Sequence, residues 1–336
     1  MRKRTQQRCA LALAIGVAAG MFAYAHLVLI DPVSLGYDFT WPWRAARALI
    51  AHRDPYAVIV PTGQFPFDNY FKYPLPAAIL ALPLAWMSAA AAAATFGGIS
   101  AALLAWGLTR DGWHRLWILA SAPFAITMES GQWSTLLMAG ALLAPLSWVA
   151  VCKPTVGVAV FAYRPNWWAV LGSAILLVAS FVLLPSWVVG WVSSVRADPT
   201  HAYVSLGTLI GGPVLLLALL RWRHPEARYL VGLALVPQIL TFYTAFLPML
   251  VAETKRESQA MAMLGWLTWL CWTWQVGNGP EGRFAPVFAG YWILALLCVP
   301  ALVMVLRRPN TGEVKARVAE TGGNSRLQSA RNGARV

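Results

Sequence analysis

One polar stretch, residues 31–73, holds the side chains of this sequence that are best suited to chemistry. Four of the 13 acidic residues lie in it: Asp31, Asp38, Asp54 and Asp68. Asp38 is followed closely by two arginines, Arg44 and Arg47. A carboxylate at the boundary between an apolar surface and water can act as a general base toward a hydroxyl group. The alternative is that Asp38 is a solvated loop acid or a helix cap, which is the commoner role of a loop aspartate.

Other polar residues could bind a substrate beside Asp38. The cations of this stretch are Arg44, Arg47, Arg53 and Lys72. They could hold a phosphate or only contact lipid head groups. Tyr56 and Tyr73 could stack on a sugar ring or anchor the chain at the membrane interface. Gln132 could hydrogen-bond a sugar or cap a helix end, and Glu129 is either a second acid nearby or a loop charge.

The sequence has no pattern for metal, redox or nucleophilic chemistry. The four cysteines lie far apart, without a C-x-x-C pair, and we interpret them as small buried hydrophobes. No Ser/His/Asp motif, Walker motif or glycine-rich dinucleotide loop is present. We therefore expect neither a metal nor an organic cofactor.

The composition indicates a membrane protein that crosses the bilayer several times. Of 336 residues, 59% are apolar and 12% are charged, and the mean hydropathy is +0.58. A soluble domain carries about 25% charged residues, so a soluble enzyme, a disordered protein and a disulfide scaffold are excluded. The net charge of +13 does not indicate nucleic-acid binding. Most basic residues lie at the chain ends and between apolar segments, as the positive-inside rule predicts.

We predict an all-α polytopic protein with about ten transmembrane helices in the cell (inner or plasma) membrane. The apolar run 9–30 is long enough to span the bilayer, and we interpret it as an uncleaved signal-anchor. Residues 1–306 form a single transmembrane domain, and residues 307–336 form a disordered, basic tail. Counting the spans puts both termini in the cytoplasm.

Three segments decide the details of this topology. We predict that 134–151 is one span running inward, which would leave Lys153 near the cytoplasmic face. An intramembrane lysine is a functional candidate, but at this position we prefer snorkelling toward water. Two prolines interrupt 229–252, which is either one span or, as we prefer, two short arms turning near Pro237-Gln238. Residues 40–52 are predicted to form an interfacial helix, with Thr40 as its cap and Pro42 in its first turn. Its apolar face, which we expect on the membrane surface, consists of Trp41, Ala45, Ala48 and Leu49.

The first half of the chain resembles the family 87 glycosyltransferases, which are polyprenyl-phosphate-mannose-dependent mannosyltransferases and relatives with the C-type membrane glycosyltransferase fold. The similar strings, in the family's order, are Asp38-Phe39, Ala45-Ala46-Arg47-Ala48-Leu49, Arg53-Asp54-Pro55-Tyr56 and Phe71-Lys72-Tyr73-Pro74. Gly131-Gln132 is similar to the family's Gly-Gln-Asn motif, and Lys153-Pro154 to its Lys-Pro motif. Two departures are Tyr73-Pro74-Leu75-Pro76 in place of Tyr-Pro-Pro, and the absence of an Asn after Gln132.

The resemblance implies a C-type fold and the transfer of a mannose-like hexose from a polyprenyl-phosphate-linked donor. The acceptor would be a hydroxyl of a lipid or glycan on the extracytoplasmic face, and Asp38 would be the catalytic base. The substrate-binding candidates are Arg44, Arg47, Tyr56, Lys72, Tyr73 and Gln132. The expected partners are the donor, the acceptor and membrane lipids, without nucleic acid. The alternatives are a lipid or solute transporter, which would need several ionisable residues in mid-span, and a non-catalytic membrane scaffold.

Overall fold

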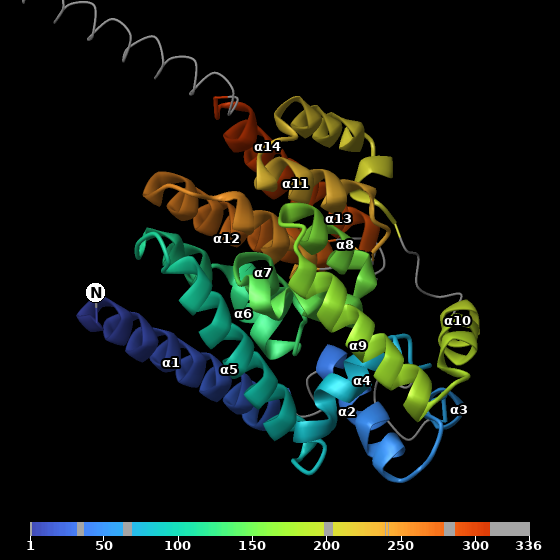
Figure 1. Ribbon diagram of the computed structural model, residues 1–336. Helices are drawn as coiled ribbons and strands as arrows, with labels where there is room; N and C mark the ends of the chain where they lie inside the picture. Colours follow the sequence, from blue (N-terminus) through green and yellow to red (C-terminus); the bar gives the residue numbers. More distant parts are fainter. Residues whose placement is uncertain are drawn as a thin grey trace, which may run out of the picture.

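The computed structural model describes residues 2–31, 37–62, 69–197, 204–238, 240, 242–278 and 286–309. These residues are mostly helical and contain no strand, apart from one isolated bridge between Val204 and Gln238 (Figure 1). The α-helices are α1 (Arg2–Ala25), α2 (Tyr37–Ile50), α3 (Pro55–Val58), α4 (Leu75–Ala81), α5 (Ala89–Leu108), α6 (Ala122–Glu129), α7 (Ser134–Leu142), α8 (Pro154–Tyr163), α9 (Trp167–Leu183), α10 (Trp187–Ala197), α11 (Pro225–Leu235), α12 (Lys255–Asn278), α13 (Pro286–Ile293) and α14 (Val299–Leu306). Short 3-10 and π-helical segments are η1 (His26–Ile30), η2 (Leu82–Leu84), η3 (His114–Ala120), η4 (Ala144–Cys152), η5 (Leu206–Thr208), η6 (Gly212–Arg221), η7 (Phe242–Val251) and η8 (Leu294–Cys298). The all-α prediction is confirmed for this part of the chain.

Helices α1 and α5 lie side by side and antiparallel, as Figure 1 shows. Glycine allows their backbones to approach: a Cβ on Gly98 would come within 2.8 Å of the Gly16 carbonyl oxygen. The start of α1 lies at the end of α5, because the Arg8 guanidinium donates to the Trp106 carbonyl oxygen at 2.8 Å. Arg8 also stacks 4.2 Å above the Trp106 ring.

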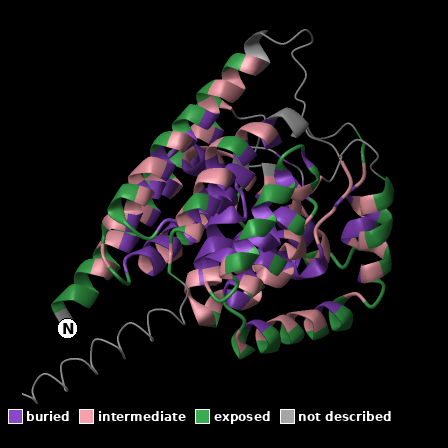
Figure 2. Cartoon of the chain, turned by 90° about the horizontal axis from the view of Figure 1, so that it is seen from above, coloured by how far each residue is buried: buried purple, intermediate pink, exposed green. Residues whose placement is uncertain are grey.

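Three helical segments are long and apolar enough to cross a membrane: Lys3–Ile30, Ala89–Leu108 and Ala289–Leu306. The pair α9 and α10, bent by 92°, is a fourth if it counts as one span. Leu13, Val17 and Met21 on α1 are exposed, as are many apolar side chains of α9. Figure 2 shows exposed residues along the helix that begins at the N-terminus. Such apolar surface fits a lipid environment. The predicted total of about ten spans is not confirmed, because no other helix in the described residues is both long enough and apolar enough.

The segment predicted to be one inward span, 134–151, is a hairpin of α7 and η4 instead. The chain turns at Leu143, which has an extended backbone with φ −109° and ψ 95°. Pro145 explains the break, because proline cannot donate the helical hydrogen bond and disfavours a helical residue before it. A Cβ on Gly140 in α7 would come within 2.9 Å of the Val149 side chain in η4, so the two arms are in close contact.

This hairpin reverses the chain before Lys153. Its turn lies at the end of α5, since a Cβ on Gly107 would meet the Leu142 side chain at 3.0 Å. From there η4 runs back, and α8 begins after Lys153 with Pro154 in its first turn. Lys153 therefore returns to the end of the molecule where α7 starts.

The close contact of α8 with η4 gives a test of this packing. A Cβ on Gly157 would overlap the Ala150 carbonyl oxygen, so Gly157→Ala must separate the two segments. We expect a loss of about 1–3 kcal/mol in unfolding free energy, seen as a lower melting temperature in detergent. Gly97→Ala is the control, because its Cβ would only reach Met128 Sδ at 3.6 Å. Equal melting temperatures for the two variants would contradict the packing.

Residues 229–252 form two arms, in agreement with the preferred prediction. The Tyr229 hydroxyl of α11 donates to the Leu247 carbonyl oxygen of η7 at 3.3 Å, so the arms lie together. At the turn, Gln238 and Val204 exchange backbone hydrogen bonds of 3.0 and 3.1 Å. These hydrogen bonds satisfy the backbone N–H and C=O groups of Gln238, which follows Pro237 just after the end of α11.

Helix α2 begins at Tyr37, three residues before the predicted cap, and Thr40 is buried within it. The Asp38 backbone N–H donates to the Ser130 carbonyl oxygen at 3.1 Å, and this tertiary contact satisfies a donor that a cap would otherwise serve. The apolar face of α2 does not lie free for the membrane. It packs on a small cluster of α3, α4 and α10 that includes Tyr56, Phe71 and Trp187.

Candidate functional site

The centre of the candidate site is an ion pair between Asp38 and Lys153. The Lys153 Nζ atom lies 3.0 Å from Asp38 Oδ2. The side chains are 16% exposed for Lys153 and 22% for Asp38, so both can meet a ligand while largely shielded from water. The predicted position of Lys153, near the opposite face, is wrong. The hairpin of α7 and η4 brings it to the first residues of α2.

Two more predicted residues join this pair. The Lys153 ammonium lies 3.4 Å from the Tyr73 hydroxyl oxygen and 3.5 Å from Gln132 Oε1. It also lies 5.5 Å from the centre of the Tyr73 ring. Asp38, Tyr73, Gln132 and Lys153 come from four segments of the chain, and we call them the Asp38 cluster.

Local structure fixes Gln132 in the cluster. Gly131 has φ +60°, the left-handed conformation that glycine adopts without strain. This turn lets the Gln132 N–H donate to the Thr127 carbonyl oxygen at 2.9 Å. The Gln132 side chain is only 3% exposed, and its amide is thereby held toward Lys153.

Aromatic rings form the wall behind the cluster. Phe39, next to Asp38, stacks on Phe96 of α5 with ring centres 4.2 Å apart. Trp133 is fully buried, with its ring centre 5.0 Å from Phe96 and 6.0 Å from Tyr73. Close packing of this kind restricts the rotamers of its neighbours. Phe39 and Trp133 are the chain neighbours of Asp38 and Gln132, and Trp133 also contacts Tyr73. Their packing on Phe96 therefore fixes these three residues relative to α5.

Tyr56 and Lys72 support Tyr73 through its backbone. The Tyr56 hydroxyl donates to the Tyr73 carbonyl oxygen at 3.0 Å, and Tyr56 is only 6% exposed. Burial, with a smaller contribution from Asp54, raises the pKa of Tyr56 far above its ordinary value. The Lys72 carbonyl oxygen accepts a 2.8 Å hydrogen bond from Trp191 Nε1. These contacts position the chain around Tyr73 rather than present Tyr56 to a ligand.

The two arginines of α2 stack on tryptophans of the same helix. The Arg44 guanidinium lies 5.2 Å from the Trp41 ring centre, and that of Arg47 lies 4.9 Å from the Trp43 ring centre. These contacts join residues three and four positions apart, which share a helix face. The predicted role of Arg44 and Arg47 in binding phosphate stays a prediction.

The other acidic residues near the site have separate partners or lie outside the described residues. Asp54 caps α3, since its Oδ1 accepts from the Tyr56 N–H at 2.8 Å. Glu129 lies 3.9 Å from His26 Nδ1. Burial raises the pKa of Glu129, and the charge of His26 opposes this shift. Asp68 lies outside the described residues. The acid of this stretch that is described in contact with Lys153 is Asp38.

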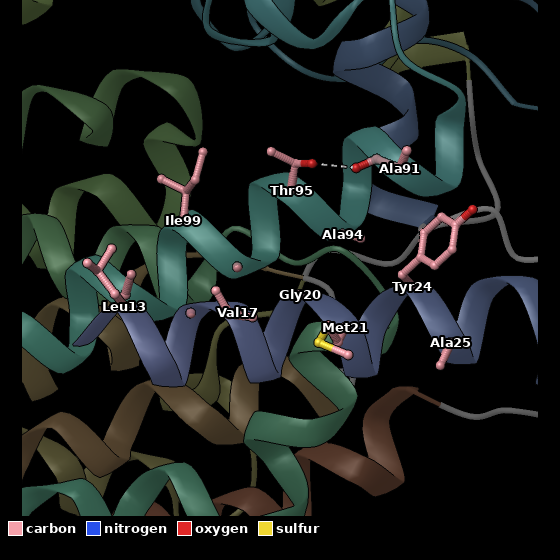
Figure 3. Close-up of a pocket in the computed structure, with 13 residues that line it drawn as sticks. Leu13, Val17, Gly20, Met21, Tyr24, Ala25, Ala91, Ala94, Thr95 and Ile99 are labelled. Atoms are coloured by element: carbon pink, nitrogen blue, oxygen red, sulfur yellow. Dashed lines mark hydrogen bonds between the residues drawn. The ribbon is translucent and has the colours of Figure 1, made fainter. Parts of the chain in front are cut away.

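An apolar groove of about 590 Å³ follows α1 and α5 (Figure 3). It extends from Leu13 and Ile99 to Tyr24 and Ala91. Its lining has no charged residue, and the Thr95 hydroxyl is satisfied by the Ala91 carbonyl oxygen at 2.7 Å. The groove is therefore suited to a hydrocarbon chain. Thr95, which lines the groove, precedes Phe96, the residue of α5 that stacks on Phe39.

Comparisons of this chain with protein-family models, with curated proteins and with solved structures found no match. In the described residues, no three His, Cys, Asp or Glu side chains are grouped so as to hold a metal ion. The Asp38 cluster offers a carboxylate, a phenol and an amide, each within hydrogen-bonding reach of the Lys153 ammonium.

Proposed function

We propose that this protein is an integral-membrane hexosyltransferase. It transfers a mannose-like sugar from a polyprenyl-phosphate-linked donor to a hydroxyl of a lipid or glycan acceptor. The observation that supports this proposal best is the 3.0 Å contact between Asp38 and Lys153. It joins a base for the acceptor to a cation for the phosphate of the donor, and the two charges come from distant parts of the chain.

The proposed reaction uses both members of the ion pair. Asp38 accepts the proton of the acceptor hydroxyl while the acceptor oxygen forms a bond to the anomeric carbon of the sugar. The bond between that carbon and the phosphate oxygen breaks, and its electron pair leaves with the polyprenyl phosphate. Lys153 stabilises the negative charge that develops on this leaving group. Gln132 and Tyr73 hydrogen-bond the sugar and orient it between the two charges.

A lipid-linked donor also needs a place for its hydrocarbon chain. We assign this chain to the groove between α1 and α5, whose lining is apolar. Thr95 lines the groove, and its chain neighbour Phe96 stacks on Phe39, the residue after Asp38. We propose that one donor occupies the groove and the cluster together. This assignment accounts for a charged cluster and an apolar groove in the same molecule.

We further propose that the Asp38 cluster faces the extracytoplasmic side and that both termini are cytoplasmic. The start of α1, the end of α5 and the end of α14 all lie at the opposite end of the molecule. The basic residues of that end include Lys3, Arg4, Arg8, Arg110, Arg115, Arg307 and Arg308. Positive charge flanking membrane segments favours the cytoplasmic side.

The test is a transfer assay with purified protein in detergent micelles. We expect a radiolabelled sugar to move from polyprenyl phosphate to an acceptor from a lipid and glycan panel, without a sealed compartment. A transporter would instead require a vesicle and would release an unmodified substrate inside it. Flux into sealed vesicles without any chemical product would refute the transferase.

A further inference from the structure

Besides the apolar groove, the protein has a polar cavity of about 560 Å³. It lies at the end of the molecule opposite the Asp38 cluster. It is formed where α5 ends, where η3 and α11 begin and where α8 ends. Along α5, the lining residue Gly107 follows Phe96 by 11 residues, which is about 16 Å, so the cavity is separate from the proposed site. Its charged lining residues are Arg110, Asp111, Arg115, Arg164, Glu226 and Glu253.

The carboxylates of the wall are largely compensated from outside the cavity. Arg308 Nη1 lies 3.1 Å from Glu226 Oε2 and 3.2 Å from Glu253 Oε1. The Tyr163 hydroxyl donates to Glu226 at 3.1 Å. The third acid, Asp111, is exposed and can be solvated by water. Arg308 is shared with a fourth carboxylate, because its Nη2 lies 3.9 Å from Glu257 Oε2. With Arg308 and Glu257 included, four guanidinium groups lie beside four carboxylates.

The arginines of the lining are not used in ion pairs within the described residues. Arg115 is 9% exposed and donates through Nη2 to the Leu250 carbonyl oxygen at 2.7 Å. This bond fixes a buried guanidinium in the wall with further N–H groups to donate. Arg110 and Arg164 are exposed and come from two different loops. Three guanidinium groups around one polar cavity form an arrangement that suits the oxygens of a phosphate.

Exposed tryptophans indicate the depth of this cavity in a membrane. Four of them lie within three or four residues of a lining residue: Trp113, Trp117, Trp167 and Trp168. Exposed tryptophans collect at the level of the lipid head groups. A cavity that presents guanidinium groups among helices at this level is a site where anionic head groups bind.

We propose that this cavity binds the phosphate group of an anionic ligand through Arg110, Arg115 and Arg164. Such a phosphate belongs either to a phospholipid head group at the same level or to a soluble phosphate compound. The cavity volume suits a ligand of head-group size. This site is independent of the proposed transferase, and its test needs no enzymatic activity.

The experiment measures binding to purified full-length protein by native mass spectrometry and titration calorimetry. The ligands are dihexanoyl phosphatidylglycerol and inorganic phosphate, each tested separately. We expect one bound ligand per chain, and affinity about tenfold or more lower in Arg110→Gln/Arg164→Gln. Arg223→Gln is the matched control, because Arg223 is exposed next to Trp222 but does not line the cavity. The variants also receive a melting curve, and Arg115→Gln provides a third weakened variant if it folds.

Tighter binding of phosphatidylglycerol than of phosphate would support the site with a lipid as its ligand. Equal or tighter binding of phosphate, lost in the double variant, would support it with a soluble ligand. Two outcomes would overturn the proposal. One is that neither ligand binds, and the other is that the folded double variant binds like the wild type.

Discussion

Asp38→Asn is expected to lower the rate of sugar transfer by about 10²–10⁴-fold. Asparagine keeps the shape of the side chain, and its amide oxygen can still accept from Lys153 Nζ, which lies 3.0 Å away in the wild type. The fold and donor binding should therefore persist. The loss should appear in kcat, since the amide cannot take the proton of the acceptor. Steady-state kinetics with a labelled donor measure the effect.

Asp54→Asn is the matched control for this variant. It makes the same carboxylate-to-amide change in the same polar stretch, at a residue that caps α3. Asparagine is as good a cap as aspartate, so transfer and stability should be close to wild type. If the Asp38→Asn variant transfers sugar at the wild-type rate, Asp38 is not the base. If both variants lose the same fraction of the transfer rate, residues 31–73 respond to the loss of any negative charge and Asp38 has no special role.

Lys153→Met is expected to reduce kcat/KM for transfer by about 10²–10³-fold, since it removes the cation beside the leaving phosphate. Methionine keeps an unbranched side chain of similar length, so packing changes little. Unlike Asp38→Asn, this variant should also bind the donor less tightly, because Lys153 contacts its phosphate in the proposed complex. Lys153→Arg keeps the charge and should recover part of the activity.

The double variant Asp38→Asn/Lys153→Met separates joint action from two independent losses. If the two residues act in one step, the double variant should be little worse than the poorer single variant. Lys255→Met, which removes an exposed lysine at the start of α12, controls for the loss of one positive charge. If donor affinity in Lys153→Met equals that of the wild type, Lys153 positions Asp38 but does not bind phosphate.

The sequence predicted part of the cluster because its signals are local. Asp38, Tyr73 and Gln132 were identified from their residue types and short motifs, and the structure brings all three to one place. Lys153 was missed, although its Lys-Pro string was noted. Hydropathy cannot distinguish an 18-residue apolar span from two short arms folded together. The signal for the turn is Pro145, three residues after the end of α7.

Other errors arose from contacts that local sequence does not contain. The start of α2 depends on the Ser130 carbonyl oxygen, which lies 92 positions from Asp38 along the chain. The apolar face of α2 was expected on the membrane but is covered by α3, α4 and α10. In contrast, the stacking of Arg44 on Trp41 follows helix periodicity and could have been predicted. Amphipathic patterning thus identified the helix but not what covers its face.

Single-turnover transfer tests the central claim most directly. Wild type and Asp38→Asn are loaded to equal occupancy with radiolabelled polyprenyl-phosphate mannose, and acceptor is then added. We predict that the wild type passes the label to the acceptor and releases polyprenyl phosphate, whereas Asp38→Asn retains the intact donor. Equal transfer by the two proteins, or no transfer by a wild type that holds the donor in the presence of the full acceptor panel, would contradict the account.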